Sequence, residues 1–235
     1  MQETWTLTQR ELRAYFDSPA AYVLLTVFLL ITGWFFATSL FLENVASMRS
    51  VFNIVPFIFL FFVPAITMST FAEERRSGTL ELLLTMPIRD AHVIAGKLLS
   101  VSLVLLATIA LTIIYALSLS LLGDLDFGAT VGGYLGIFLY GMTAGAIGIF
   151  ASSLTRNQIV AFILGFAIIF LLYLFDKVTA FVPGALGGIL QYLGIEYHYK
   201  NLLRGVIDSR DVLYYVSMTI FAAVCTAYTL TRRPE

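Results

Sequence analysis

The sequence predicts an all-α integral membrane protein that crosses the membrane six times. Of its 235 residues, 59% are hydrophobic and 12% are charged, a balance that is too apolar for a water-soluble enzyme. The charged residues leave six long uncharged stretches, each close to or above the roughly 20 residues that an α-helix needs to cross a bilayer. A β-barrel would instead show short segments of alternating polarity. Six transmembrane helices are therefore expected, with an N-terminal amphipathic helix and a short cytoplasmic helix between spans two and three.

Several classes of function lack the residues that they need. Fourteen Lys and Arg stand against fifteen Asp and Glu, a net charge of −1, so no basic excess favours binding to nucleic acid. One cysteine, Cys225, and two distant histidines, His92 and His198, give no metal-ligand spacing. No G-x-x-x-x-G-K-[S/T] motif and no Ser-His-Asp or H-E-x-x-H arrangement occurs. We therefore predict a chain that is not an enzyme and has no catalytic, cofactor-binding or metal-binding residues.

Residues 1–17 are predicted to form an amphipathic helix on the cytoplasmic membrane surface. Trp5, Leu12 and Phe16 fall on one face at about 100° per residue, while charged residues such as Arg10 face away. The alternative is a disordered tail.

The first span is predicted to begin with Ser18 as its N-cap and Pro19 at its first helical position. Pro56 and Pro64 are expected to kink the second span. The glycines of the fourth span are expected to pack helices within one subunit. The six uncharged stretches are 18–42, 50–72, 98–123, 127–155, 157–175 and 212–231.

The positive charges indicate which ends are cytoplasmic. Nine of the fourteen basic residues lie on the side that also holds both termini, so the positive-inside rule places both termini in the cytoplasm. We expect a multi-pass protein of the bacterial inner membrane. The nine are Arg10, Arg13, Arg75, Arg76, Arg89, Lys97, Arg156, Arg232 and Arg233.

Residues 176–211 are predicted to form an extracytoplasmic segment that is broken or re-entrant. The uncharged run 178–195 is long enough to be a seventh span, but Pro183, Gly184 and further glycines interrupt it. A seventh span is the alternative, and it would place the C-terminus outside. His198 is expected to be an interfacial side chain. The aromatic residues of an outer belt would be Phe181, Tyr192, Tyr197 and Tyr199.

Residues 73–90 are predicted to form the chemically densest loop, on the cytoplasmic side. Gly78 permits a bend after span two, and Thr79 can cap a short helix that Pro87 ends about two turns later. Asp90 can cap the helix that becomes span three.

The short helix Thr79–Met86 has more apolar side chains than one membrane-facing side requires. This excess suggests a second apolar surface for a protein partner. The alternative is an ordinary interfacial helix that lipid headgroups stabilise. The apolar side chains are Leu80, Leu82, Leu83, Leu84 and Met86.

The run EERRSGTLELLLTMPIRDAHVIAGKLLS, residues 73–100, resembles the signature of ABC-2 type transporter permeases. The six-span layout and the turn Ser153–Gln158 before span five extend the resemblance over most of the chain. The segment Tyr197–Asp208 before span six is most similar to the gliding-motility-type branch of the family.

The resemblance implies a permease subunit that a separate cytoplasmic ATPase drives, with ATP and Mg bound in that partner. Thr79–Met86 would be the coupling helix in a groove of the ATPase, and the N-terminal helix would be the interface helix beside it. A second copy of the chain, or a homologous permease, would complete a dimer in which spans one and five lie closer to the contact. The implied ATPase-coupling residues are Glu73, Glu74, Arg75, Arg76, Gly78, Thr79, Glu81, Leu82, Leu83 and Pro87.

Three functions are compatible with these residues to different degrees. An exporter is preferred, because most relatives of this layout export. A structural or mechanotransmitting subunit, which passes ATPase-driven motion to a periplasmic companion without substrate transport, shares the same loop signature. An ion-coupled carrier or channel is disfavoured because no Lys, Arg, Asp, Glu or His lies in the middle of a span. Membrane lipid is an expected partner, and the sequence indicates neither the substrate nor its pathway.

Overall fold

The structure is a computed structural model of the whole chain, and all of its described secondary structure is helical. Short gaps separate the described residues, which are 2–42, 47–85, 89–123, 125–179, 182 and 184–231. The helices are α1 (Gln2–Phe16), α2 (Pro19–Phe41), α3 (Arg49–Thr67), α4 (Ser69–Ser77), α5 (Thr79–Thr85), α6 (Asp90–Leu111), α7 (Ile113–Leu122), α8 (Phe127–Ser153), α9 (Gln158–Val178), α10 (Ala185–Leu193), α11 (Ile195–Leu203) and α12 (Ser209–Thr231).

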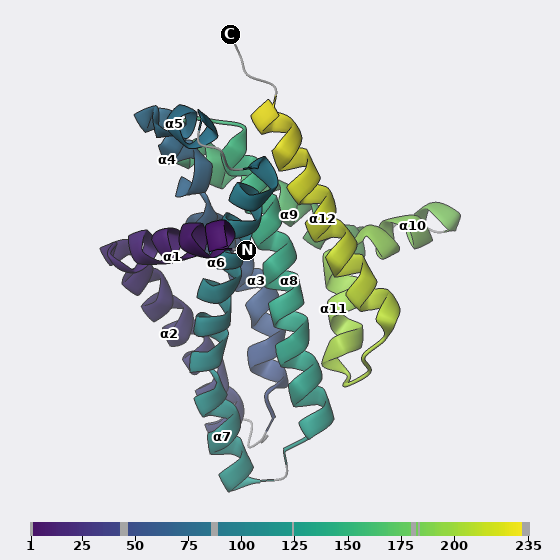
Figure 1. Cartoon of the computed structure of the whole chain (residues 1–235). Helices are drawn as coiled ribbons and strands as arrows, with labels where there is room; N and C mark the ends of the chain where they lie inside the picture. The colour runs from purple at the N-terminus through teal and green to yellow at the C-terminus, as the bar shows by residue number, and fades with distance from the viewer. Residues whose placement is uncertain are drawn as a thin grey trace.

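Among the described residues, six helical stretches are long and apolar enough to cross a membrane, which confirms the predicted fold class. Two of them are interrupted: α3 and α4 together form the second, Arg49–Ser77, and α6 and α7 the third, Asp90–Leu122. The second span extends beyond the predicted limit because Glu73–Ser77 continue as helix α4 instead of forming a loop. The short helix α5 and the end of α12 lie at one end of the molecule, and α7 lies at the other (Figure 1).

Helices α3 and α8 form the centre of the bundle. The chain itself buries 67% of the hydrophobic window of the second span and 78% of that of α8, but only 17% of those of α2 and α9. Glycines on α8 permit this packing because they have no Cβ. A Cβ at Gly148 would lie 2.1 Å from Thr67 Oγ1, and one at Gly133 would lie 2.4 Å from the Phe52 ring, so either would clash. These contacts are within one chain, as the sequence predicts for the fourth span.

Helix α1 lies across the long helices and packs against α6 (Figure 1). Leu7 and Thr8 are buried, and the Thr8 hydroxyl donates a hydrogen bond to the Gly96 carbonyl, 3.1 Å away. The helicity and amphipathic character of this segment were predictable, whereas the face that meets α6 was not. Trp5 is 54% exposed and is placed to enter a surrounding lipid surface.

The segment 176–211, which the sequence predicts to be extracytoplasmic, contains two short helices, α10 and α11, that meet at Gly194. Helix α11 enters the bundle, where the Tyr199 hydroxyl donates to the Phe52 carbonyl at 2.7 Å. Helix α11 can approach α8 closely because Gly132 has no side chain. A Cβ at this position would lie only 2.3 Å from the Leu202 carbonyl oxygen. In its described residues the segment is broken into two nine-residue helices, each too short to be a candidate span; whether the segment re-enters the membrane stays a prediction. The predicted positions of Phe181 and Pro183 lie outside the described residues.

Two side chains of this segment correct the sequence interpretation. Tyr199 is buried instead of standing in an aromatic belt. His198 is also buried: its Nδ1 lies 2.6 Å from Asp211 Oδ1, and its ring stacks on Tyr214 with 3.9 Å between centroids. Pairing with a carboxylate that is equally buried makes the interior acceptable for this imidazole. Tyr192, at 53% exposure, keeps the predicted exposed position.

Candidate functional site

The site begins at Gly78, where the chain turns from α4 into α5. Gly78 has φ 73°, in the left-handed region that favours glycine, so the predicted bend is present. One side of α5 packs against its own chain through Leu80 and Leu83, which are 7% and 4% exposed. The other side presents Glu81 and Leu82, with Leu82 at 65% exposure. The free face of α5 is therefore narrower than the sequence suggests, because Leu83 is already buried.

The ends of the loop differ from the predicted caps. Thr79 is the first residue of α5 and does not cap it; its hydroxyl lies 2.9 Å from that of Ser77. Asp90 is the first residue of α6, and Arg89 occupies the N-cap position. The predicted helix end at Met86 and Pro87 lies outside the described residues.

A network of four charged side chains joins α1, α4 and α6. Lys97 Nζ lies 2.9 Å from Glu74 Oε1 and 3.2 Å from Glu11 Oε1, and it donates to the Thr70 carbonyl at 2.7 Å. Arg10 reaches the same carboxylates, at 2.7 Å from Glu11 and 2.9 Å from Glu74. The Lys97 side chain is 1% exposed. Two cations and two anions thus balance one another where α1, α4 and α6 meet.

The two carboxylates of the network stabilise the charged form of Arg10. Partial burial alone lowers the pKa of Arg10, but the hydrogen bonds and charges of Glu11 and Glu74 outweigh it and keep the pKa above its ordinary value. A buried ammonium such as that of Lys97 needs comparable compensation, and removal of one partner leaves an uncompensated charge. The network therefore fixes how α1 and α6 are placed relative to α4.

Sequence reasoning missed this network, although it contained one signal. Lys97 lies seven residues into α6, directly before a long uncharged run, and an ionisable residue at the edge of a span needs a partner. Its partners come from positions as distant as Glu11, so the sequence could not identify them.

The opposite side of α4 meets the beginning of α9. The Gln158 amide donates a hydrogen bond to Glu73, and Glu73 also lies 3.9 Å from Arg76. Arg75 Nε is buried without a hydrogen-bond partner. The structure thus brings the predicted residues Glu73, Glu74, Arg75 and Arg76 onto one helix but directs them to different neighbours.

The junction of α3 and α4 is stabilised from α8. The helix runs through Pro56 and Pro64, and its interruption falls later, at Met68. There the Ser152 hydroxyl accepts hydrogen bonds from the backbone N–H groups of Phe71 and Ala72, both at 3.0 Å, and donates to the Met68 carbonyl at 2.8 Å. One side chain therefore satisfies backbone groups that the interruption leaves free.

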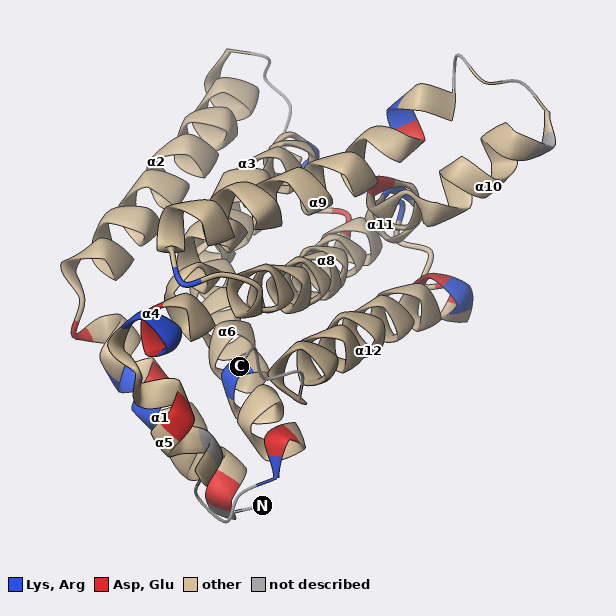
Figure 2. Cartoon of the chain, turned by 90° about the horizontal axis from the view of Figure 1, so that it is seen from above, with Lys and Arg blue, Asp and Glu red and all other residues tan. Residues whose placement is uncertain are grey.

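Helix α4 therefore lies at the centre of this arrangement, with α1, α5, α6, α8 and α9 around it. We call these packed helix segments the joint. Figure 2 shows charged residues gathered on α1 and α4, in contrast to the long tan stretches of the other helices. Within the described ranges, no group of three or more His, Cys, Asp or Glu side chains is placed to hold a metal ion.

Comparison with known proteins agrees with this description. No curated protein matches the chain significantly. A family model described as ABC-2 family transporter protein matches residues 31–194, which is more than half of the chain and includes the bend at Gly78, helix α5 and Lys97. This family consists of non-catalytic membrane subunits of ABC transporters that generally work with a cytoplasmic ATPase. The chain is therefore a multi-pass membrane protein that belongs to the ABC-2 transporter family.

Proposed function

We propose that this chain is the permease subunit of an ATP-driven exporter in the bacterial inner membrane, with both termini in the cytoplasm. A separate ATPase subunit binds ATP and Mg, and this chain binds no cofactor. The observation that carries the proposal is the two-sided α5: Leu80 and Leu83 anchor it to its own chain while Glu81 and Leu82 stay free. An exposed leucine beside a carboxylate suits a groove with an apolar floor and a basic or amide rim.

Movement of α5 would reach the spans by three routes through α4. Glu74 connects α4 to Lys97 on α6, and Glu73 connects it to Gln158 on α9. Ser152 connects the α3–α4 junction to α8. Closure of the ATPase on ATP would therefore act on several spans together instead of bending a single helix. Opening of a cavity toward the outside would follow from this concerted shift.

A second permease would complete the export pathway. Helices α2 and α9 both pack against α3 and bury little of their own apolar surface within the chain. Between them, Phe57 and Phe61 on the otherwise buried α3 are each 47% exposed. We call α2, α9 and these two rings the aromatic face. Aromatic residues are enriched at protein interfaces, which supports this face as the contact with a second copy or a homologous permease.

The decisive experiment changes the free face of α5 in the complex with the ATPase. Glu81→Arg replaces an attraction with a repulsion, so we expect ATPase association to weaken by about 2 kcal/mol, or about thirtyfold. Leu82→Asp should act in the same direction through lost apolar contact. Gly78→Pro should misdirect α5 without disturbing the spans. Association is measured by co-purification of the two subunits and by permease-stimulated ATP hydrolysis.

The control is Arg204→Glu, a charge reversal at an exposed residue at the end of α11. It should leave ATPase binding and stimulation unchanged, and every variant should retain wild-type abundance in the membrane. If Glu81→Arg, Leu82→Asp and Gly78→Pro all bind and stimulate the ATPase as the wild type does, α5 is a lipid-surface helix and the proposal fails.

A further inference from the structure

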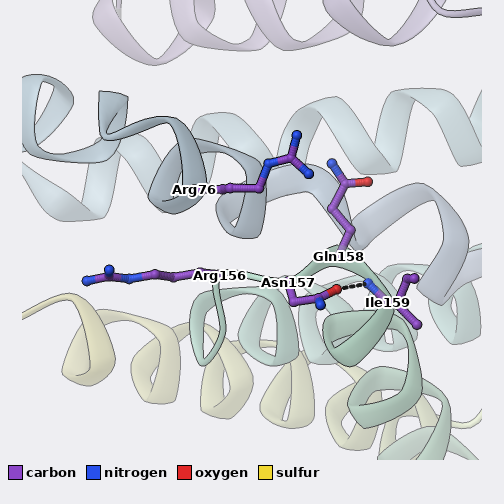
Figure 3. A pocket seen from close by; sticks show the side chains of 5 residues that line it. All are labelled: Arg76, Arg156, Asn157, Gln158 and Ile159. Carbon is purple, nitrogen blue, oxygen red and sulfur yellow. Dashed lines mark hydrogen bonds between the residues drawn. The ribbon is translucent and has the colours of Figure 1, made fainter.

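An open cleft of about 370 Å³ lies between the end of α4 and the beginning of α9. Arg76 reaches it from α4, whereas Arg156, Asn157, Gln158 and Ile159 reach it from the α8–α9 loop and the first turn of α9. Figure 3 shows the two arginine side chains in separate layers with their guanidinium groups directed to opposite sides, while the Asn157 amide oxygen accepts a hydrogen bond from the Ile159 N–H. Donors thus approach the opening from two separate parts of the chain.

The cleft has an excess of positive charge. The Arg76 side chain is 70% exposed, and its guanidinium lies 3.9 Å from the Glu73 carboxylate. Glu73 also accepts a hydrogen bond from the Gln158 amide. Arg75 lies close enough to Arg156 for their charges to repel, and Arg75 Nε is buried without an acceptor. Among the described residues, Arg76 shares its carboxylate with Gln158, and Arg75 and Arg156 have no ion pair, which leaves positive charge for a further anion.

An apolar surface begins where the charged surface ends. Ile159 closes the cleft and is 68% exposed, and Ile163, one turn further along α9, is 55% exposed. Helix α9 is a candidate membrane span, so these exposed side chains would meet the hydrocarbon region of a surrounding bilayer. A ligand that is anionic at one end and apolar at the other matches a positively charged surface that adjoins an apolar one.

We propose that the cleft binds the phosphate group of an anionic phospholipid, with the acyl chains along Ile159 and Ile163. Guanidinium groups present forked N–H donors that match phosphate oxygens, and the amide of Asn157 or Gln158 can add a neutral donor. An acidic side chain of a protein partner would satisfy the charge but would leave the isoleucines without a matching group. The lipid would brace α4 against α9, and its binding requires no ATPase, so the inference goes beyond the proposed function.

The test is a binding measurement on the purified, delipidated full chain without any partner. Native mass spectrometry would follow titration with phosphatidylglycerol, with phosphatidylcholine of the same chain length, and with inorganic phosphate. We expect one tight phosphatidylglycerol per chain, at least about tenfold weaker binding of phosphatidylcholine, and no competition from millimolar phosphate. Arg156→Gln and Arg76→Gln should each weaken phosphatidylglycerol binding by about tenfold. Both residues are exposed, so neither substitution should impair folding.

Arg13→Gln is the matched control, because it removes one exposed positive charge from the same predicted side of the membrane. Equal loss of lipid binding in Arg13→Gln would show a general charge effect and overturn the site. Competition by inorganic phosphate would identify a free-anion site, not a lipid site. If Arg156→Gln keeps its lipid but loses ATPase association, the cleft contacts an acidic surface of the ATPase and the lipid proposal is wrong. The lipid-binding readouts are made without the ATPase and do not depend on whether α5 docks as proposed.

Discussion

At the scale of single residues, Lys97 is the side chain on which the joint depends most. Its ammonium contacts Glu74, Glu11 and the Thr70 carbonyl, and it lies 4.8 Å from the centre of the Phe71 ring. Loss of Lys97 would therefore remove the cation that Glu11 and Glu74 share with Arg10, in a place with little access to water.

We predict that Lys97→Met lowers stability by about 2–3 kcal/mol, with Arg10 compensating for part of the lost charge. Thermal unfolding in detergent measures this loss. Lys177→Met is the control, because Lys177 pairs with Glu196 at 2.9 Å while its side chain is 45% exposed, and exposed pairs contribute less than about 1 kcal/mol. Addition of Glu74→Gln to Lys97→Met should recover part of the stability. Equal shifts in the two lysine variants would show that the network is not important for stability.

The residues that sequence reasoning missed are those whose partners are distant in the chain. Gly78 could be assigned because a bend between two helices requires a particular backbone conformation, which is a local property. His198 was assigned to the interface because nothing nearby in the sequence indicates that Asp211 would pair with it inside the bundle. The same holds for Ser152, which contacts Phe71 across 81 positions. Local chemistry is readable from the sequence, whereas tertiary pairing is not.

At the scale of elements, glycine placement decides how closely helices approach. Gly148 on α8 accommodates Thr67, whose hydroxyl oxygen would lie 2.1 Å from an added Cβ. Thr67 belongs to the last turn of α3, directly before the interruption at Met68. The contact therefore holds the upper part of the joint against the centre of the bundle.

We predict that Gly148→Ala destabilises the protein by about 1–3 kcal/mol, since a close-packed contact must be forced apart. Gly188→Ala is the control, because nothing lies within 4 Å of its added Cβ, and it should change the unfolding temperature little. Thr67→Ala combined with Gly148→Ala should restore part of the lost stability. If Gly148→Ala unfolds at the same temperature as Gly188→Ala and the wild type, this packing is contradicted.

Element boundaries were predictable to different degrees for physical reasons. The start of α2 was correct because Ser18 and Pro19 act locally; the Ser18 hydroxyl accepts from the Ala20 N–H. Glu73–Ser77 were assigned to a loop because charge normally marks the end of a span, yet their contacts with α1, α6 and α9 allow the helix to continue. The ion pairs and the hydrogen bond with other helices stabilise these charged residues, so the helix does not end where the charged residues begin.

At the scale of the whole molecule, helix α5 and the end of α12 lie at the same end of the bundle (Figure 1). Both are therefore expected on the same side of the membrane. Cysteine labelling tests the orientation in a Cys225→Ser background. We predict that Ser77→Cys and Thr231→Cys react only after the inner face is opened, while Arg204→Cys reacts in intact cells. All three positions are exposed, so access depends on the membrane side. Labelling of Thr231→Cys in intact cells would show an error in the number of crossings or in their direction.

Assembly depends on which apolar surface the single chain leaves uncovered. Helices α2 and α9 flank α3, whereas α12 packs against α8, and α2 and α12 lie on opposite sides of the bundle (Figure 2). The aromatic face and α12 are therefore separate candidates for contact with a second permease. In a two-fold dimer through the aromatic face, α2 of one copy would meet α9 of the other.

We predict that the aromatic face forms the dimer contact, and crosslinking of two differently tagged copies can decide between the faces. Trp34→Cys on α2 should form a disulfide with Leu171→Cys on α9 of the other copy; these side chains are 72% and 53% exposed. Phe221→Cys on α12, at 64% exposure, is an equally accessible control and should not crosslink with Leu171→Cys. Because all three side chains are exposed, a difference in disulfide yield reflects the distance between the two cysteines and not their accessibility to the oxidant. Preferential crosslinking through Phe221→Cys would assign the dimer contact to α12 and leave the aromatic face to lipid.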